Sequence, residues 1–100
     1  MYAEVKNTIN SKDIVVFVLG YGSITGDSEL TEHYCNDAIR LTKSLEEEFS
    51  TLIVDVVGKS KLIDDLYGLT KIRSWPKVFY KGSYLGGHGK LVEFVSNRAK

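Results

Sequence analysis

The sequence predicts an α/β fold, a four-stranded mixed sheet flanked by helices. Residues 14–18 form a continuous apolar run without polar alternation, which is typical of a strand buried on both faces of a parallel sheet. An amphipathic segment follows, and a second apolar run at residues 52–57 completes a right-handed strand–helix–strand unit with parallel strands. Lys81-Gly82, between two short apolar runs, predicts an antiparallel hairpin.

The expected order of elements is α, β, α, β, α, β, β, α. Val5 and Ile9 lie one turn apart in the first predicted helix. Ser60 is expected to cap the third helix, and Gly86-Gly87 to open the last one. The expected elements span residues 3–11, 14–18, 28–49, 52–57, 60–69, 77–80 and 83–85, with a last helix around residues 91–95.

The longest predicted helix, residues 28–49, has one apolar face. At roughly 100° per residue, six side chains fall in a single stripe that we assign to the core. Cys35 lies at the flank of this stripe, where a small, semi-buried side chain is expected. The three glutamates at residues 46–48 fall mostly outside it. The stripe consists of Leu30, Tyr34, Ala38, Leu41, Leu45 and Phe49.

The composition excludes several classes of partner. Thirteen basic and thirteen acidic residues cancel over the one expected domain, residues 1–100, so no net field concentrates it on nucleic acid or an anionic membrane. No apolar run approaches the length that crosses a bilayer. The single cysteine excludes an internal disulfide, which agrees with a cytoplasmic protein. His33 and His88 belong to separate predicted helices without metal-ligand spacing, so no metal site is expected.

The order of elements and the amino-acid sequences of three segments resemble those of the glutaredoxins, which have a form of the thioredoxin fold. Residues 74–76 (Ser-Trp-Pro) resemble the family's Thr-Val-Pro, and residues 85–87 (Leu-Gly-Gly) resemble its Ile-Gly-Gly. Residues 5–17 are similar to the opening of eukaryotic members. The resemblance implies that Pro76 follows a cis peptide bond. It also implies that the backbone of Trp75 occupies the position that pairs with the cysteine part of glutathione.

The family's nucleophilic cysteine has no counterpart in this chain. Aligned forward from the first strand, Tyr-Cys-Pro-Tyr-Cys falls on residues 21–25, and counted back from the second strand, Cys-Pro-Tyr-Cys falls on residues 32–35. Neither alignment places a cysteine first. The offset implies a longer loop, with the helix starting between Gly26 and Glu32. Residues 25–28 (Thr-Gly-Asp-Ser) resemble the glutamate-rich-like branch, small proteins that bind Src-homology-3 domains and generally lack the redox cysteines.

Cys35 is a poor substitute for the missing nucleophile. A glutaredoxin thiolate lies at a helix N-terminus, where amide groups and the helix dipole lower the thiol pKa. Cys35 is expected about two turns into its helix, beyond that influence, and the carboxylates of Glu32 and Asp37 would raise the pKa of its thiol. The family's two ionic anchors for glutathione fall on Leu19 and Gly89. Any glutathione binding is therefore expected to be weak, and no cofactor is predicted.

Two functions are consistent with these residues. The first is a redox-inactive module that binds a protein or peptide segment in the former substrate groove, with Tyr21, Ile24 and Trp75 as an exposed apolar patch. The alternative is a monothiol, glutathione-dependent disulfide oxidoreductase that uses Cys35. Both histidines are expected at exposed positions, and the oligomeric state is left open. The expected groove consists of Tyr21, Gly22, Ser23, Ile24, Thr25, Trp75, Pro76, Gly87 and His88.

Overall fold

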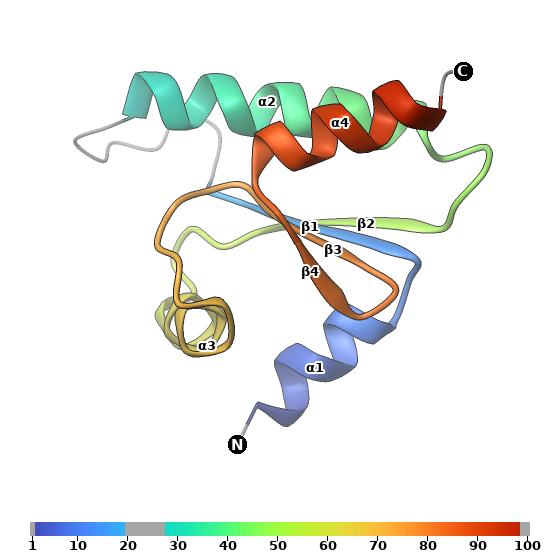
Figure 1. The fold of residues 1–100 in the computed structure, drawn as a ribbon. Helices are drawn as coiled ribbons and strands as arrows, with labels where there is room; N and C mark the ends of the chain where they lie inside the picture. Colours follow the sequence, from blue (N-terminus) through green and yellow to red (C-terminus); the bar gives the residue numbers. More distant parts are fainter. Residues whose placement is uncertain (1, 20–27, 99–100) are drawn as a thin grey trace.

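The computed structural model describes residues 2–19 and 28–98, with residues 28–32 described by their backbone alone. It confirms the predicted α/β fold and the order of its elements (Figure 1). In this part of the chain, no helix combines the length and the apolar character needed to cross a membrane. The elements are α1 (Ala3–Asn10), β1 (Ile14–Val18), α2 (Ser28–Ser44), β2 (Thr51–Asp55), α3 (Ser60–Thr70), β3 (Lys77–Tyr80), β4 (Ser83–Gly86) and α4 (His88–Arg98).

The described strands form one mixed sheet in the order β2-β1-β3-β4. β1 pairs in parallel with β2, where Val16 lies opposite Ile53. It pairs antiparallel with β3, where Val16 lies opposite Val78. The chain passes from β1 to β2 through α2, which is the kind of crossover that parallel neighbours require. β1 and β3 are therefore the central strands, and β2 and β4 are the edges.

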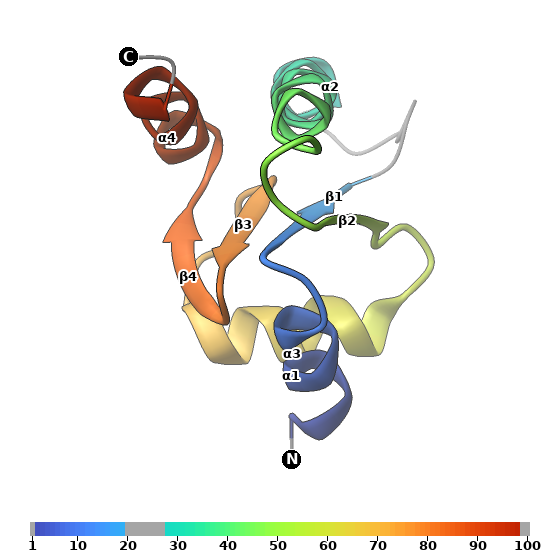
Figure 2. The same cartoon turned by 90° about the vertical axis from the view of Figure 1, so that its right-hand side faces the viewer.

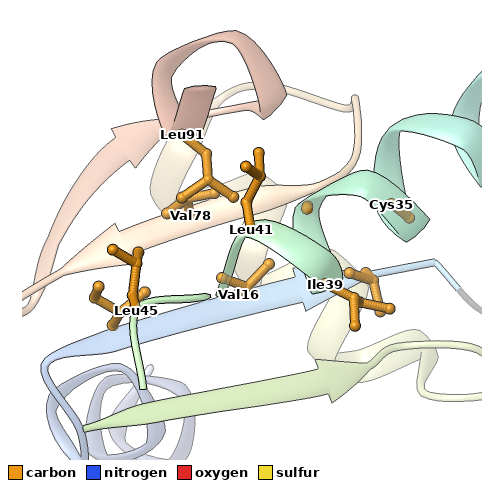
Figure 3. Packing of buried hydrophobic residues seen from close by; sticks show 10 residues of the cluster. Val16, Cys35, Ile39, Leu41, Leu45, Val78 and Leu91 are labelled. Carbon is orange, nitrogen blue, oxygen red and sulfur yellow. The ribbon is translucent and has the colours of Figure 1, made fainter. Parts of the chain in front are cut away.

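Helices cover both faces of the sheet. Figure 2 shows α2 and α4 on one face and α1 and α3 on the other. Alternate residues of β1 supply the two sides: Val16 belongs to the cluster under α2 and α4, which we call the α2/α4 core, and Phe17 to the α1/α3 core. All five residues of β1 are buried, as the unbroken apolar run predicted. Figure 3 shows Val16, Val78 and Leu91 within the α2/α4 core.

α2 begins at Ser28, within the predicted window, but it ends at Ser44 instead of Phe49. In the turn that follows, the Leu45 amide donates to the carbonyl oxygen of Thr42 at 3.0 Å, which is a hydrogen bond to the third preceding residue. Residues 46–48 are three successive glutamates, and negative charge at the C-terminal end of a helix dipole opposes further helix. The prediction extended the helix through residues that this electrostatic effect disfavours.

The buried face of α2 is rotated from the predicted stripe. Tyr34, assigned to the core, is 39% exposed, whereas Cys35 is 2% exposed and lies inside the α2/α4 core (Figure 3). Ile39 and Thr42, which the stripe omitted, are buried as well. Residues 35, 38, 39 and 42 follow the i, i+3, i+4, i+7 spacing of a single helix face. Ala38, Leu41 and Leu45 are buried as predicted, Phe49 packs partly buried against the same core, and the side chain of Leu30 lies outside the described residues.

β2 ends two residues earlier than predicted, and α3 begins differently. After Asp55 the chain turns, with the Val57 amide donating to the Asp55 carboxylate at 2.9 Å and Gly58 at φ 77°. Ser60 is the first helical residue and not the cap, because Lys59 takes the N-cap position without a side-chain cap bond. The Lys59 Nζ donates instead to the backbone carbonyl oxygen of Asp55 at 3.1 Å.

Truncating Leu91 should destabilise the fold far more than truncating its neighbour Val92. Leu91 is 0% exposed in the α2/α4 core, whereas Val92 is 37% exposed on the same helix. Leu91→Ala is expected to lower the free energy of unfolding by about 2–5 kcal/mol through lost burial and a residual cavity, and Val92→Ala by less than about 1 kcal/mol. Urea unfolding followed by circular dichroism measures both, and equal losses would contradict the core assignment.

Candidate functional site

The structure brings together the described residues of the expected groove. The Trp75–Pro76 peptide bond is cis, and Pro76 is buried. A side-chain carbon added at Gly87 would lie 3.5 Å from the Pro76 carbonyl oxygen, so the chain entering α4 passes close to the proline. His88 is the first residue of α4. The other expected groove residues, Tyr21, Gly22, Ser23, Ile24 and Thr25, lie outside the described residues.

Trp75 is less exposed than the predicted apolar patch required. Its side chain is half-buried and packs against both the α2/α4 core and the α1/α3 core. The Nζ of Lys77 lies 4.6 Å from the centre of the indole ring, which is a cation–π contact. The indole therefore links the groove to the interior of the protein, and its truncation affects stability as well as surface.

Lys77 is a candidate that the sequence reasoning missed. It is 1% exposed at the first position of β3. Its Nζ donates to the backbone carbonyl oxygens of Ile72 and Ser74, at 3.0 Å for Ser74. Burial lowers the pKa of this ammonium to about 8. The available signal was strand alternation, because Lys77 lies two residues before the core residue Phe79 and so shares its face of the sheet.

Tyr34, Asp37 and His88 form a cluster that joins α2 to the start of α4. The His88 Nε2 and the Asp37 Oδ2 lie 2.6 Å apart in a hydrogen bond, and the His88 ring stacks on Tyr34 with the ring centres 5.0 Å apart. His88 was expected to be exposed, but these partners on α2 leave it only half-exposed. The hydrogen bond from His88, and then that from Arg40 at 2.6 Å, hold the pKa of Asp37 below its ordinary value.

The thiol of Cys35 is enclosed. Burial raises the pKa of Cys35, a hydrogen bond from the Leu19 backbone partly opposes this, and the charge of Asp55 raises the pKa further. The predicted direction is confirmed, with burial as its largest cause, and of the two carboxylates held responsible that of Glu32 lies outside the described residues. Asp37 instead faces His88 and Arg40. Cys35 lies about two turns from the start of α2, as expected.

His33 is exposed, as expected, and its ring lies beside Tyr34 with the ring centres 5.7 Å apart. Among the residues that the structure describes, no three histidine, cysteine, aspartate or glutamate side chains converge on a possible metal position. Asp37 and His88 are hydrogen-bonded to each other and the rings of Tyr34 and His88 stack, so hydrogen bonding and ring stacking hold this cluster together.

A separate cleft of about 320 Å³ lies between α1 and α3, on the other face of the sheet from α4. Its polar groups largely bind one another. The Lys61 ammonium lies 2.8 Å from the Asp65 carboxylate, and the Thr8 hydroxyl donates to the Glu4 carbonyl oxygen at 3.1 Å. The lining has two acidic and two basic residues, so the cleft favours neither an anionic nor a cationic ligand. The cleft is lined by Glu4, Val5, Thr8, Lys59, Lys61, Leu62 and Asp65.

No protein-family model and no curated protein matches this chain, but solved structures do. Glutaredoxin 2 from Chlamydomonas reinhardtii aligns over 96% of this chain and 82% of its own, with 23% identity and a TM-score of 0.70. Glutaredoxin C1 from Populus tremula x tremuloides aligns over 96% of this chain and 74% of its own, with 25% identity and a TM-score of 0.73. The fold is that of the glutaredoxins.

A buckwheat glutaredoxin solved as a complex with glutathione has the same glutaredoxin fold. It aligns over 97% of this chain and 88% of its own, with 23% identity and a TM-score of 0.65. The shared glutaredoxin fold thus covers nearly the whole chain. At these identities the likeness establishes the fold, so activity has to be argued from the residues themselves.

Asp37→Asn should flatten the acid limb of the stability profile. The pKa of Asp37 is lower in the folded protein, so its carboxylate stabilises the fold above the unfolded pKa of about 3.9. That stabilisation is lost as the pH falls through the lower folded value. Urea unfolding from about pH 5 to about pH 2 should show a smaller loss in the variant than in the wild type. His88→Gln removes the largest cause of the shift and should act the same way, whereas three equal slopes would contradict the assignment.

Proposed function

We propose that this protein is a redox-inactive module with a glutaredoxin fold, which binds an extended peptide segment of a protein partner in the former substrate groove. The groove comprises Trp75, Pro76, Gly87 and His88 together with residues 21–25. The observation that carries the proposal is the position of the single cysteine: Cys35 is buried in the core, with a raised thiol pKa.

Thiol chemistry makes this position decisive. The reactive species is the thiolate, and glutaredoxin chemistry needs it exposed at a helix N-terminus. The influence of the helix dipole fades within the first turn, and Cys35 lies beyond it. A buried thiol with a raised pKa is both less ionised at neutral pH and shielded from a disulfide substrate. These facts disfavour the alternative, a monothiol oxidoreductase that uses Cys35.

Groove binding is supported by what remains at the site. The backbone of Trp75 and the start of α4 offer main-chain groups, which bind extended peptides without needing a particular side chain. Tryptophan is also enriched at the centre of protein interfaces. The positions of the ionic glutathione anchors carry Leu19 and Gly89, so the proposal includes no glutathione cofactor. This combination agrees with membership of the branch that binds Src-homology-3 domains.

The remaining features fit a protein partner in the cytoplasm. The formal net charge of zero gives no preference for nucleic acid or an anionic membrane surface. A lone, enclosed thiol is compatible with a reducing compartment. The proposal therefore places the module in the cytoplasm, with specificity set by the shape of the groove and its main-chain groups.

The absence of thiol catalysis is tested by glutathione-coupled reduction of a small mixed disulfide. The wild type and Cys35→Ala are both expected to show no rate above the uncatalysed reaction, because the thiol is enclosed. Labelling with a thiol reagent should be slow for the native protein and rapid in denaturant. A two-cysteine glutaredoxin serves as the positive control. Turnover in the wild type that disappears in Cys35→Ala would replace the proposal with the monothiol enzyme.

Groove binding is tested with a library of random peptides selected on the immobilised protein. Selected peptides should shift the backbone amide signals around Trp75 and Gly87. Trp75→Phe, which keeps an apolar ring in the core, should weaken their binding by about tenfold or more. Val92→Ala, an exposed change elsewhere on α4, is the matched control and should bind as the wild type does. Full binding by Trp75→Phe, or shifts confined to the α1–α3 cleft, would contradict the proposal.

A further inference from the structure

The segment between α3 and Pro76 leads into the proposed groove through Trp75. α3 ends with Lys71 as its C-cap in the left-handed conformation, at φ 61°, and residues 72–75 then lead to the proline. Ile72 is 42% exposed, and its neighbours Arg73 and Ser74 are exposed too. Apolar burial therefore contributes little to fixing residues 72–74, and polar contacts have to hold them.

One buried ammonium makes three of those contacts. Lys77 pairs with Phe17 across the sheet and lies on the side of the α1/α3 core. From there its Nζ reaches back to the carbonyl oxygens of Ile72 and Ser74, and it also lies over the ring of Trp75. A single group thus holds three positions of the segment at once.

Three weaker contacts complete the anchoring. The Ile72 amide donates to the Thr70 hydroxyl oxygen at 3.2 Å, and the same hydroxyl lies 3.3 Å from the Ile72 carbonyl oxygen. The Arg73 guanidinium lies over the Tyr67 ring of α3, 4.0 Å from its centre. None of these contacts reaches Ser74 or Trp75, the two residues before the proline. Apart from the packing of the indole against both cores, the hydrogen bonds and ring contacts that the described residues make with Ser74 and Trp75 are those of Lys77.

The bond to Ser74 sets the direction of the next amide. In a planar trans peptide, the C=O of one residue and the N–H of the next point in opposite directions. Because the Ser74 carbonyl oxygen points at the Lys77 ammonium, the Trp75 N–H points away from it. Lys77 therefore orients the main-chain donor that the proposed function assigns to a bound strand.

Stability alone does not account for a lysine at this point. Burying an ammonium costs free energy unless fixed acceptors replace its water, and burial lowers the pKa of Lys77 to about 8. Methionine would fill the same space without that cost. What the ammonium adds, and methionine cannot, is a donor to the carbonyl oxygens of Ile72 and Ser74 and a cation over the indole ring.

We propose that Lys77 is a positioning residue for the groove: its ammonium fixes the Ser74–Trp75 peptide and the indole ring in the orientation that meets a bound peptide strand. This inference rests on the proposed function, because it assigns that function's backbone donor. Lys77 acts through Trp75 and does not itself touch the partner.

The first test needs no ligand, because Trp75 is the only tryptophan of the chain. Lys77→Met keeps the stem and removes the ammonium. It should lose the tryptophan band of the near-ultraviolet circular dichroism spectrum and become more open to acrylamide quenching, with an unchanged far-ultraviolet spectrum. Lys77→Arg keeps a cation and should recover part of the band. Unchanged tryptophan signals in Lys77→Met would overturn the proposal.

A matched control comes from the same hairpin. Lys81 is exposed and its Nζ lies 5.4 Å from the centre of the Tyr80 ring, so Lys81→Met removes a cation–π contact that does not involve Trp75. It should leave the tryptophan signals as in the wild type. If Lys77→Met does not fold, Lys77→Gln takes its place, since the shorter glutamine side chain cannot hold both carbonyl groups. Loss of the tryptophan band in this variant supports the proposal, and unchanged tryptophan signals overturn it.

The second test uses the peptides selected on the wild type. Lys77→Met should bind them about tenfold or more weakly, and Lys77→Arg should restore part of the affinity. The two proposals fail separately. If no peptide is selected, the proposed function is wrong, whereas the tryptophan signals still report on the orientation of Trp75. If Lys77→Met binds the peptides as tightly as the wild type, the positioning role is wrong and groove binding stands.

Discussion

The burial of β1 on every side is the constraint on which the remaining structure depends. Its five residues lie between β2 and β3 within the sheet and between helices above and below it. Such a strand needs apolar side chains on both faces, and two helical layers are needed to cover them. Because Phe17 near the end of β1 lies opposite Lys77 at the start of β3, the residues around Pro76 lie at the end of the central strands from which the chain leads on to α2.

The fold could be predicted because its signals are local and periodic. Residues 14–18, the apolar second strand and the glycine-bearing hairpin each indicate one element, and short connections leave few ways to join them. The errors lie where tertiary contacts decide. An apolar stripe places Tyr34 and Cys35 only to within one helical position, and contact with the sheet selected Cys35 for the interior. The end of α2 depended on charge, which periodicity does not include.

The candidate site could be predicted only in part, for a related reason. Trp75, Pro76 and Gly87 were found because their sequence motifs resemble those of a family. His88 contacts Asp37, 51 positions earlier in the chain, and also Tyr34 on the same helix, and no local sequence pattern predicts contacts between residues so far apart. Lysine is also among the residues least often buried, so composition argued against an interior place for Lys77.

The small contact between Lys59 and Asp55 affects how molecules of this protein meet one another. β2 is an outer strand, and the Ser50 carbonyl oxygen and the Val56 amide both bond inward to β1. By alternation the Asp55 carbonyl points outward, where the Lys59 ammonium already occupies it. A strand added from another molecule would have to displace that lysine. At this end of β2, the contact therefore hinders the intermolecular strand pairing by which exposed sheet edges aggregate.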